Sequence, residues 1–335
     1  MSQQEQQQQE EAVNKVELIP DEVLLGIFSY FDWNIIVNVC SNVCWQWRRV
    51  SKLCRLKGVE FTKTKFLEDE EVITFYSSCW RQIESLRWRG TQPLRALGPI
   101  SQWTFLQELD LSYSNVFNID ALSGCLKLSI LNLAHTPLED IHALNNCKNL
   151  RLLTLRGTQI KDVDGLRDCI NLQVLDMQYS PVQSVEGLRA CTNLKRLDLR
   201  GTPISDITVL ENCTQLVNLD LSLTYVQNLS PLQKCLQLFS LNLYRTPVKD
   251  LLPLTHCQKI DRLFLQSCKF LFDITPISTL TLLSRLDLKD TPIQDLSPLY
   301  SCSLLEFLRV PNGDIINPTA LTSTNWASLF EPLYL

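Results

Sequence analysis

The hydrophobic positions of this chain recur with a fixed period. A leucine stands at Leu106 and again every 22 residues as far as Leu238, and Ile260 continues the series. When that residue is counted as position 1, positions 4 and 6 are also leucine, with Met177 as the replacement at position 6. Apolar residues two apart predict a short strand, because alternate side chains of a strand share a face. A 22-residue period therefore predicts stacked repeats with one continuous core.

The second half of each unit has a different spacing. Positions 14 and 17 are apolar, as at Ile119 and Leu122, and a spacing of three suits a tight helical turn on the side opposite the strand. One extra residue precedes Leu106, and another lies in the unit that opens at Ile260. Including units that open at residues 83 and 305, we count eleven.

Two polar or small positions repeat with the same period. Position 9 carries a hydroxyl that can hydrogen-bond the turn backbone, at Ser114, Thr136, Thr158, Ser180, Thr202, Thr224, Thr246 and Thr291. Position 20 is cysteine at Cys125, Cys147, Cys169, Cys191, Cys213, Cys235, Cys257 and Cys302. This spacing places equivalent sulfurs at the same point of successive coils, where a buried cysteine packs as a small apolar residue. We therefore expect core packing, and neither a metal site nor disulfides.

The arrangement L-x-x-L-x-L resembles the leucine-rich-repeat family. The resemblance implies an α/β fold, a curved solenoid with parallel strands on its concave face and short helical or 3-10 turns on its convex face. The threonines at position 9 and the cysteines at position 20 are similar to variants of this repeat in unicellular eukaryotes, including kinetoplastids.

The segment 16–61 lacks the repeat and has helical periodicity instead. Pro20 precedes Asp21 and Glu22, a favourable helix opening, and a second apolar-periodic stretch spans 35–50. Two or three short helices are too small to bury all these apolar residues. The segment is therefore either a cap that closes the first coil or a docking face for another protein.

This segment resembles the F-box, through Ile19-Pro20-Asp21-Glu22, Ile27-Phe28-Ser29-Tyr30-Phe31 and Val43-Cys44-Trp45-Gln46-Trp47. The resemblance implies a small all-α domain that docks on the Skp adaptor and, through it, on a cullin. The adaptor-binding residues that it implies are Ile19, Pro20, Leu24, Ile27, Phe28 and Phe31.

These patterns predict five regions. We expect a disordered Gln-rich tail at 1–15, an F-box at 16–60, a linker or cap at 61–82, about eleven leucine-rich repeats at 83–315 and a C-terminal cap at 316–335.

The strand face is the predicted substrate surface. Positions 3, 5, 7 and 8 point outward, and parallel strands about 4.8 Å apart align them into stripes. Alternatively, the acidic and basic side chains there form a solvated ion-pair lattice that contributes little. The predicted substrate-binding residues are Tyr113, Arg156, Tyr179, Arg200, Tyr244, Arg245, Arg262, Phe264 and Arg285. The apolar run from Phe270 to Phe272 predicts either a binding loop or a poorly packed coil.

Charge, composition and motifs argue against several classes of function. A net charge of −5 with mixed signs argues against nucleic acid as a partner. The three histidines form no nucleophile–base pattern and no phosphate-binding Gly-rich loop is present, so we expect neither an enzyme nor a cofactor. No secretory signal and no membrane-spanning apolar run is seen, which predicts an intracellular protein, cytoplasmic or nuclear.

The leading hypothesis is a substrate-recognition subunit of an SCF-type cullin ubiquitin ligase, in which the F-box holds the adaptor and the repeats hold an unknown substrate protein. The alternative is a non-catalytic leucine-rich-repeat scaffold or regulatory subunit, similar to a phosphatase regulator, whose N-terminal helices are only a cap. A third hypothesis is an F-box protein that acts outside ubiquitination.

Overall fold

The computed structural model describes residues 59–61, 84–88 and 103–316. Within these ranges the strands form one sheet whose spatial order follows the sequence. Each strand from β1 to β12 pairs in parallel with the next, and β13 pairs antiparallel with β12. The strands are β1 (Val59–Phe61), β2 (Ser85–Trp88), β3 (Glu108–Asp110), β4 (Ile130–Asn132), β5 (Leu152–Thr154), β6 (Val174–Asp176), β7 (Arg196–Asp198), β8 (Asn218–Asp220), β9 (Ser240–Asn242), β10 (Arg262–Phe264), β11 (Arg285–Asp287), β12 (Phe307–Arg309) and β13 (Ile315–Ile316).

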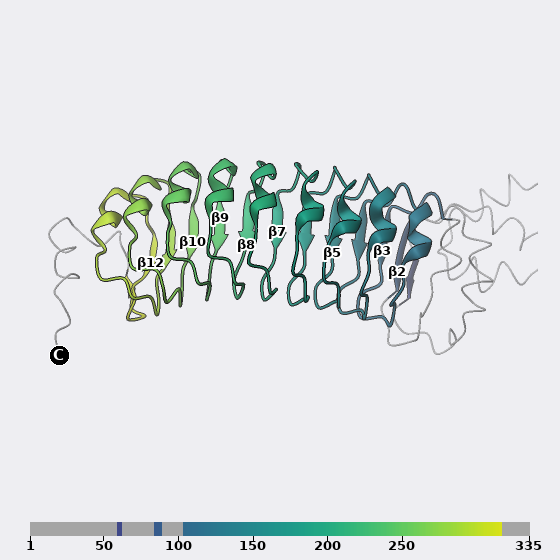
Figure 1. The fold of residues 1–335 in the computed structure, drawn as a ribbon, viewed down its shortest axis with the longest axis horizontal. Coiled ribbons are helices and arrows are strands. Elements are labelled where there is room, and N and C mark those ends of the chain that lie inside the picture. The colour runs from purple at the N-terminus through teal and green to yellow at the C-terminus, as the bar shows by residue number, and fades with distance from the viewer. Residues whose placement is uncertain (1–58, 62–83, 89–102, 317–335) are drawn as a thin grey trace, which may run out of the picture.

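A 3-10 turn follows each strand from β3 to β11, as the three-residue apolar spacing predicts. Figure 1 shows these turns stacked in a row along one side of an elongated array of coils. They are η3 (Asp120–Gly124), η4 (His142–Asn146), η5 (Asp164–Leu166), η6 (Glu186–Leu188), η7 (Thr208–Asn212), η8 (Ser230–Lys234), η9 (Leu252–His256), η10 (Thr275–Thr279) and η11 (Ser297–Ser301). The leucine-rich-repeat solenoid predicted from the sequence is therefore confirmed in these residues.

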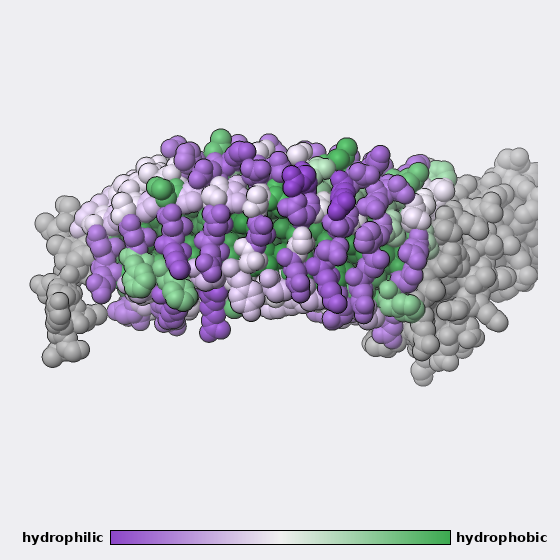
Figure 2. Space-filling model, viewed as in Figure 1, coloured by the Kyte–Doolittle hydropathy of each residue, from purple (hydrophilic) through white to green (hydrophobic). Residues whose placement is uncertain are grey.

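The core is one continuous cluster that extends from Leu86 to Val310. Leu175 at position 4 and Met177 at position 6 of one coil are completely buried, and the same positions are buried in its neighbours. Burying a leucine side chain contributes about 1.5–3 kcal/mol, and in a solenoid the neighbouring coils provide that burial. Figure 2 shows columns of hydrophilic side chains across the outer surface, with hydrophobic residues visible between them.

The repeated cysteines form a buried ladder. The thiol of Cys169 donates to the carbonyl oxygen of Leu144 at 3.5 Å, and the thiol of Cys191 donates to that of Leu166 at 3.6 Å. Burial raises the pKa of Cys191 to about 12. The position-20 cysteines from Cys125 to Cys302 are buried, which confirms the predicted core packing.

The position-9 hydroxyls hydrogen-bond the turn backbone, as predicted. Thr202 Oγ1 donates to the carbonyl oxygen of Leu199, at position 6 of the same coil, at 2.7 Å. Equivalent bonds of 2.6–2.7 Å are made by Ser114, Thr136, Thr158, Ser180, Thr224, Thr246 and Thr291. Cys268 differs, because its thiol donates to Leu243 of the preceding coil at 3.1 Å.

Position 8 has a backbone conformation that the repeat pattern does not reveal. Its φ angle lies between 54° and 68° in every coil from Tyr113 to Asp290. The N–H of position 9 donates to the carbonyl of position 6, as from Thr202 to Leu199 at 3.1 Å, which closes a four-residue turn. A positive φ at the third residue of such a turn is the type II arrangement. Each coil therefore leaves the sheet through the same turn, with position 7 as its second residue and position 8 as its third.

The apolar run in the unit that opens at Ile260 divides between the interior and the surface. Leu271 is completely buried, whereas Phe270 and Phe272 are exposed. Leu271 therefore continues the core, and the two phenylalanines flank it on the outside. Within the described residues, no helix has both the length and the apolar content that crossing a bilayer requires.

Candidate binding surface on the strand face

The outward residues of the strands lie in register, as predicted. Asp198 on β7 is paired with Asp176 on β6 and with Asp220 on β8. Neighbouring strands are about 4.8 Å apart, so equivalent side chains form continuous rows across the sheet. Three carboxylates thus stand side by side in the position-5 row.

Position 5 also supports the next turn. The Oδ1 atom of Asp198 accepts the backbone N–H of Arg200 at 3.1 Å, and that of Asp220 accepts the N–H of Ser222 at 2.8 Å. Asn242 accepts from position 7 of its own coil in the same way, at 3.0 Å. Asp or Asn at position 5 therefore orients the backbone of the residue two places later. This role is separate from the ion-pair lattice that the sequence offered as an alternative.

The central carboxylate of the row has an altered acidity. Burial, together with the negative charge of Asp220, raises the pKa of Asp198 to about 6. Hydrogen bonds from the Arg200 N–H and from Gln178 Nε2, the latter at 2.7 Å, oppose this rise. Asp198 therefore titrates closer to neutrality than an ordinary aspartate, whose pKa is about 3.9.

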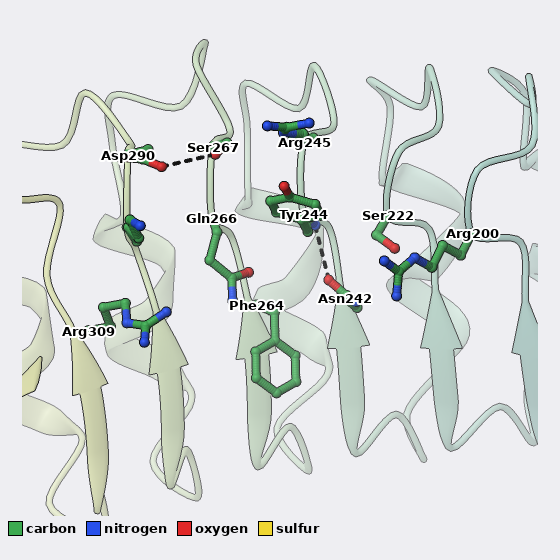
Figure 3. Close-up of a pocket in the computed structure, with 11 residues that line it drawn as sticks. Arg200, Ser222, Asn242, Tyr244, Arg245, Phe264, Gln266, Ser267, Asp290 and Arg309 are labelled. Carbon is green, nitrogen blue, oxygen red and sulfur yellow. Dashed lines mark hydrogen bonds between the residues drawn. The ribbon is translucent and has the colours of Figure 1, made fainter. Parts of the chain in front are cut away.

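Beside this row the strand face is hollowed. A cavity of about 510 Å³ spans six successive coils, and Figure 3 shows the side chains around it. All its lining residues occupy positions 5, 7 or 8, because these are the positions that the strands and type II turns direct outward. They are Arg200, Ser222, Asn242, Tyr244, Arg245, Phe264, Gln266, Ser267, Lys289, Asp290 and Arg309.

Four buried polar atoms at this hollow have no hydrogen-bond partner. They are Nε of Arg200, Oγ of Ser222, Oε1 of Gln266 and Nε of Arg309. No other buried side-chain nitrogen or oxygen in the described part of the chain is left unsatisfied. Leaving such a group unpaired costs about 1–3 kcal/mol, so the great majority are paired in native proteins. Their concentration at one place makes the hollow the candidate binding site on this face.

Four of the nine predicted substrate-binding residues line this hollow, namely Arg200, Tyr244, Arg245 and Phe264. Figure 3 shows Phe264 between Arg200 and Arg309. The guanidinium carbon of Arg245 lies 5.2 Å from the ring centroid of Tyr244, a cation–π distance.

The other five lie elsewhere on the solenoid. The ring of Tyr179 stands between the guanidinium groups of Arg156 and Arg200, at 5.9 and 5.7 Å. Tyr113 stacks on the imidazole ring of His135, with the ring centroids 4.6 Å apart.

Arg262 on β10 and Arg285 on β11 both occupy position 3 of their repeats and are paired in register. Arg262 lies over the Phe239 ring at 5.6 Å and contacts Asp261 at 3.2 Å, outside the hollow.

The sequence interpretation did not select several lining residues, including Ser222, Gln266 and Arg309. These residues occupy positions 5 and 7, which the sequence predicts to point outward, so their repeat positions could have identified them. The predicted adaptor-binding residues Ile19, Pro20, Leu24, Ile27, Phe28 and Phe31 lie outside the described residues, so their role stays a prediction.

The described cysteines, histidines and carboxylates form no cluster of three that could hold a metal ion. The side chains that line the hollow offer hydrogen-bonding, charged and aromatic groups.

Comparison with known families is consistent with this architecture. Residues 16–56 match the F-box-like family model, and residues 148–190 match the model of two leucine-rich repeats. The chain therefore contains an F-box-like segment followed by leucine-rich repeats. No curated protein matches the sequence significantly.

Several solved structures share the fold. The functional domain of InlJ from Listeria monocytogenes, which includes a cysteine ladder, is 21% identical with a TM-score of 0.64, over 77% of this chain and 54% of that one. A leucine-rich-repeat protein of Leptospira interrogans is 17% identical with a TM-score of 0.56, over 81% and 80%. An internalin, InlF, from Listeria monocytogenes is 25% identical with a TM-score of 0.54, over 66% and 71%. These likenesses support the solenoid fold, and the chain spans about half of the InlJ domain.

Proposed function

We propose that this protein is a substrate-recognition subunit of an SCF-type cullin ubiquitin ligase. The observation that carries the proposal is the order of its parts: an F-box-like match at residues 16–56 precedes a solenoid whose strand face has an unsatisfied, charged hollow. In this role the F-box-like segment docks on the Skp adaptor, and the strand face holds the substrate protein.

The adaptor contact is assigned to the apolar residues that fit the F-box pattern, Ile19, Pro20, Leu24, Ile27, Phe28 and Phe31. A segment of about 40 residues is too short to bury this many apolar side chains by itself, so a partner surface that covers them is favourable. The chain supplies no chemistry in this proposal. It brings a substrate to the cullin-bound machinery by binding two partners at once.

The hollow suits a protein substrate. Its aromatic side chains, Tyr244 and Phe264, are flanked by arginines, and aromatic residues and arginine are the types most enriched among interface hot spots. The net charge of −5 favours a protein partner over nucleic acid, since binding to a phosphate backbone relies on an excess of basic residues.

The first test is capture of the Skp adaptor by the full-length chain. We expect the adaptor to co-purify with the natural chain and to be lost from the variant Pro20→Ala, Leu24→Asp, Ile27→Asp. The matched control is Ser29→Asp, which adds a charge in the same segment off its apolar spacing and should retain the adaptor. Far-ultraviolet circular dichroism must show that each variant keeps its repeat fold.

Two outcomes separate the alternatives. If neither the natural chain nor the variant captures adaptor while both are folded, the N-terminal segment is only a cap and the scaffold hypothesis replaces ours. If adaptor is captured, cells in which the triple variant that does not bind the adaptor replaces the natural chain decide the ligase role. Accumulation of proteins captured by the strand face supports a ligase, whereas their unchanged turnover favours a role outside ubiquitination.

A further inference from the structure

We propose that the hollow between Arg200 and Arg309 binds an extended peptide segment that carries carboxylate side chains on both sides of an apolar residue. The proposal rests on the function proposed above, because it names the class of segment that the substrate face takes. Charge, unsatisfied atoms and dimensions each support it.

The hollow is positively charged on a chain that is acidic as a whole. Arg200, Arg245, Lys289 and Arg309 line it together with one carboxylate, Asp290, so the lining carries four positive charges against one negative charge. The full chain has a net charge of −5. The positive charge is therefore local and favours an anionic group at this place.

Most of these cations have no ion-pair partner within the described residues. Arg309 Nη1 contacts Asp287 Oδ2 at 3.3 Å, whereas Arg200, Arg245 and Lys289 form no ion pair there. Arg200 faces the Tyr179 ring on one side, at 5.7 Å, and extends toward the hollow on the other. Among the described residues, no carboxylate lies within ion-pair distance of its guanidinium group.

The unsatisfied atoms specify the chemistry of the ligand. The Nε–H groups of Arg200 and Arg309 are buried donors without acceptors. The edge of a guanidinium that presents Nε–H and one Nη–H binds the two oxygens of a carboxylate side by side. Gln266 Oε1, in contrast, is an unpaired acceptor, and Ser222 Oγ can donate or accept. A peptide supplies carboxylate acceptors together with backbone N–H donors, whereas a fully ionised inorganic anion such as sulfate offers acceptors alone.

The dimensions fit an extended chain that crosses the strands. Arg309 lies on β12, and Arg200 follows the end of β7, so five strand spacings of about 4.8 Å, or about 24 Å, separate their coils. An extended peptide advances about 3.3 Å per residue, so about seven residues cover this length. In Figure 3 both guanidinium groups extend from the two ends toward Phe264. The segment therefore places its carboxylates at the ends and its apolar residue on Phe264 and Tyr244.

The neighbouring acidic row limits where such a segment can lie. Asp198 and Asp220 line a second, smaller hollow that shares Asn242 and Phe264 with the first. A carboxylate displaced toward that side meets two negative charges against one positive charge, that of Arg196. This arrangement selects the register of an acidic peptide and disfavours a long polyanion such as nucleic acid.

The test is direct binding of labelled peptides to the full-length chain, measured by fluorescence anisotropy. The probes are synthetic peptides of about seven residues, with two glutamates on each side of a central phenylalanine, leucine or tryptophan. In one matched set, glutamine replaces every glutamate. In another, phosphoserine occupies the two end positions and glutamine replaces the remaining glutamates. We expect the glutamate peptides to bind at least about tenfold more tightly than the glutamine set.

The variants locate the site. Arg200→Gln should weaken binding of the glutamate peptides about tenfold or more, because it removes a charged, unsatisfied donor. Arg156→Gln is the matched control, since Arg156 also flanks the Tyr179 ring and occupies position 7, but lies outside the hollow. Arg156→Gln should leave the affinity unchanged, and the thermal unfolding midpoints should show that both variants are folded.

Several results would overturn the proposal: no binding by any glutamate peptide, equal binding of the glutamine set, binding of the phosphoserine set alone, or equal losses in Arg200→Gln and Arg156→Gln. Adaptor capture is measured on the same preparations. Peptide binding without adaptor capture would reject the ligase function and keep this site, whereas adaptor capture without peptide binding would do the reverse.

Discussion

The ring of Tyr179 occupies the space that a side chain at residue 201 would need. Its Cδ1 atom lies 2.7 Å from the point where the Cβ atom of residue 201 would stand. Gly201 also has a φ of 68°, in the left-handed region. His135 and Gly157 have the same relationship one pair of coils earlier, with His135 Nδ1 at 2.7 Å. Glycine at position 8 thus serves both the type II turn and the packing of the aromatic ring before it.

We predict that Gly201→Ala lowers the free energy of unfolding by about 1–3 kcal/mol, because it combines a left-handed alanine with overpacking against the ring. Urea denaturation followed by circular dichroism measures the change. In the double variant Tyr179→Ala, Gly201→Ala the collision is absent, so adding Gly201→Ala to Tyr179→Ala should cost less than adding it to the natural chain. An equal cost in both backgrounds would show that the ring does not restrict residue 201.

The position-9 hydroxyl is predicted to contribute through its hydrogen bond more than through its volume. Thr202 is almost completely buried, and its Oγ1 donates to the Leu199 carbonyl oxygen at 2.7 Å. Thr202→Val keeps the shape and removes the donor, so it should cost about 0.5–1.5 kcal/mol of unfolding free energy. Thr202→Ser keeps the donor, as Ser180 does in the preceding coil, and should retain the hydrogen-bond contribution.

Differential scanning calorimetry measures the unfolding midpoint of each variant. The midpoint of Thr202→Val should lie below that of Thr202→Ser, because only the serine keeps the hydrogen-bond donor. A valine variant as stable as the natural chain would mean that the backbone N–H at position 9 satisfies the turn alone.

Asp198 is predicted to make folding stability depend on pH in a particular direction. Its folded pKa is raised to about 6, above the unfolded value of about 3.9. The folded state therefore binds this proton more readily, so the associated stability is present below about pH 4 and is lost as pH rises through about 6. Relative to the natural chain, Asp198→Asn should become progressively more stable as the pH is raised from about 4 to about 6.

Asparagine is a fitting replacement because Asn242 occupies the same position in a nearby coil and accepts the position-7 N–H at 3.0 Å. Urea denaturation of both proteins at a series of pH values gives the difference in unfolding free energy. A difference that stays constant across this range would show that Asp198 titrates normally.

The cysteine ladder is predicted to be chemically inert in the folded protein. The thiolate is the nucleophile, and burial raises the pKa of Cys191 to about 12 and that of Cys169 to about 12. Iodoacetamide at about pH 8, below the usual thiol pKa of about 8.5, should therefore leave both unmodified in the native state and modify both in urea. Peptide mapping by mass spectrometry resolves each site. Rapid modification of Cys191 in the absence of urea would contradict the buried ladder.

The repeat period predicts the buried residues of this chain better than the residues that line the hollow. Leu175 and Cys191 were placed correctly in the core because their period is the period of the solenoid. In contrast, Arg262 and Arg200 both belonged to the predicted substrate surface, yet only Arg200 lines the hollow. The position numbers alone could not separate them, since Arg262 contacts Asp261 and the Phe239 ring, and these contacts depend on side-chain direction.

The sequence by itself determined the stacked coils, the parallel strands, the 3-10 turns, the hydroxyl bonds and the buried cysteines. Every one of these contacts joins the same two repeat positions in each coil or in each pair of adjacent coils, so residues one period apart along the chain have the same surroundings. Only the tertiary structure decided the left-handed residues at position 8, the raised pKa of Asp198 and the hollow from Arg200 to Arg309. The left-handed conformation recurs in every coil, but residues as different as Tyr113, Leu223 and Asp290 adopt it, so no residue type marks it in the sequence. The pKa of Asp198 and the hollow depend on how non-repeating side chains fill the space across several coils, which the period does not encode.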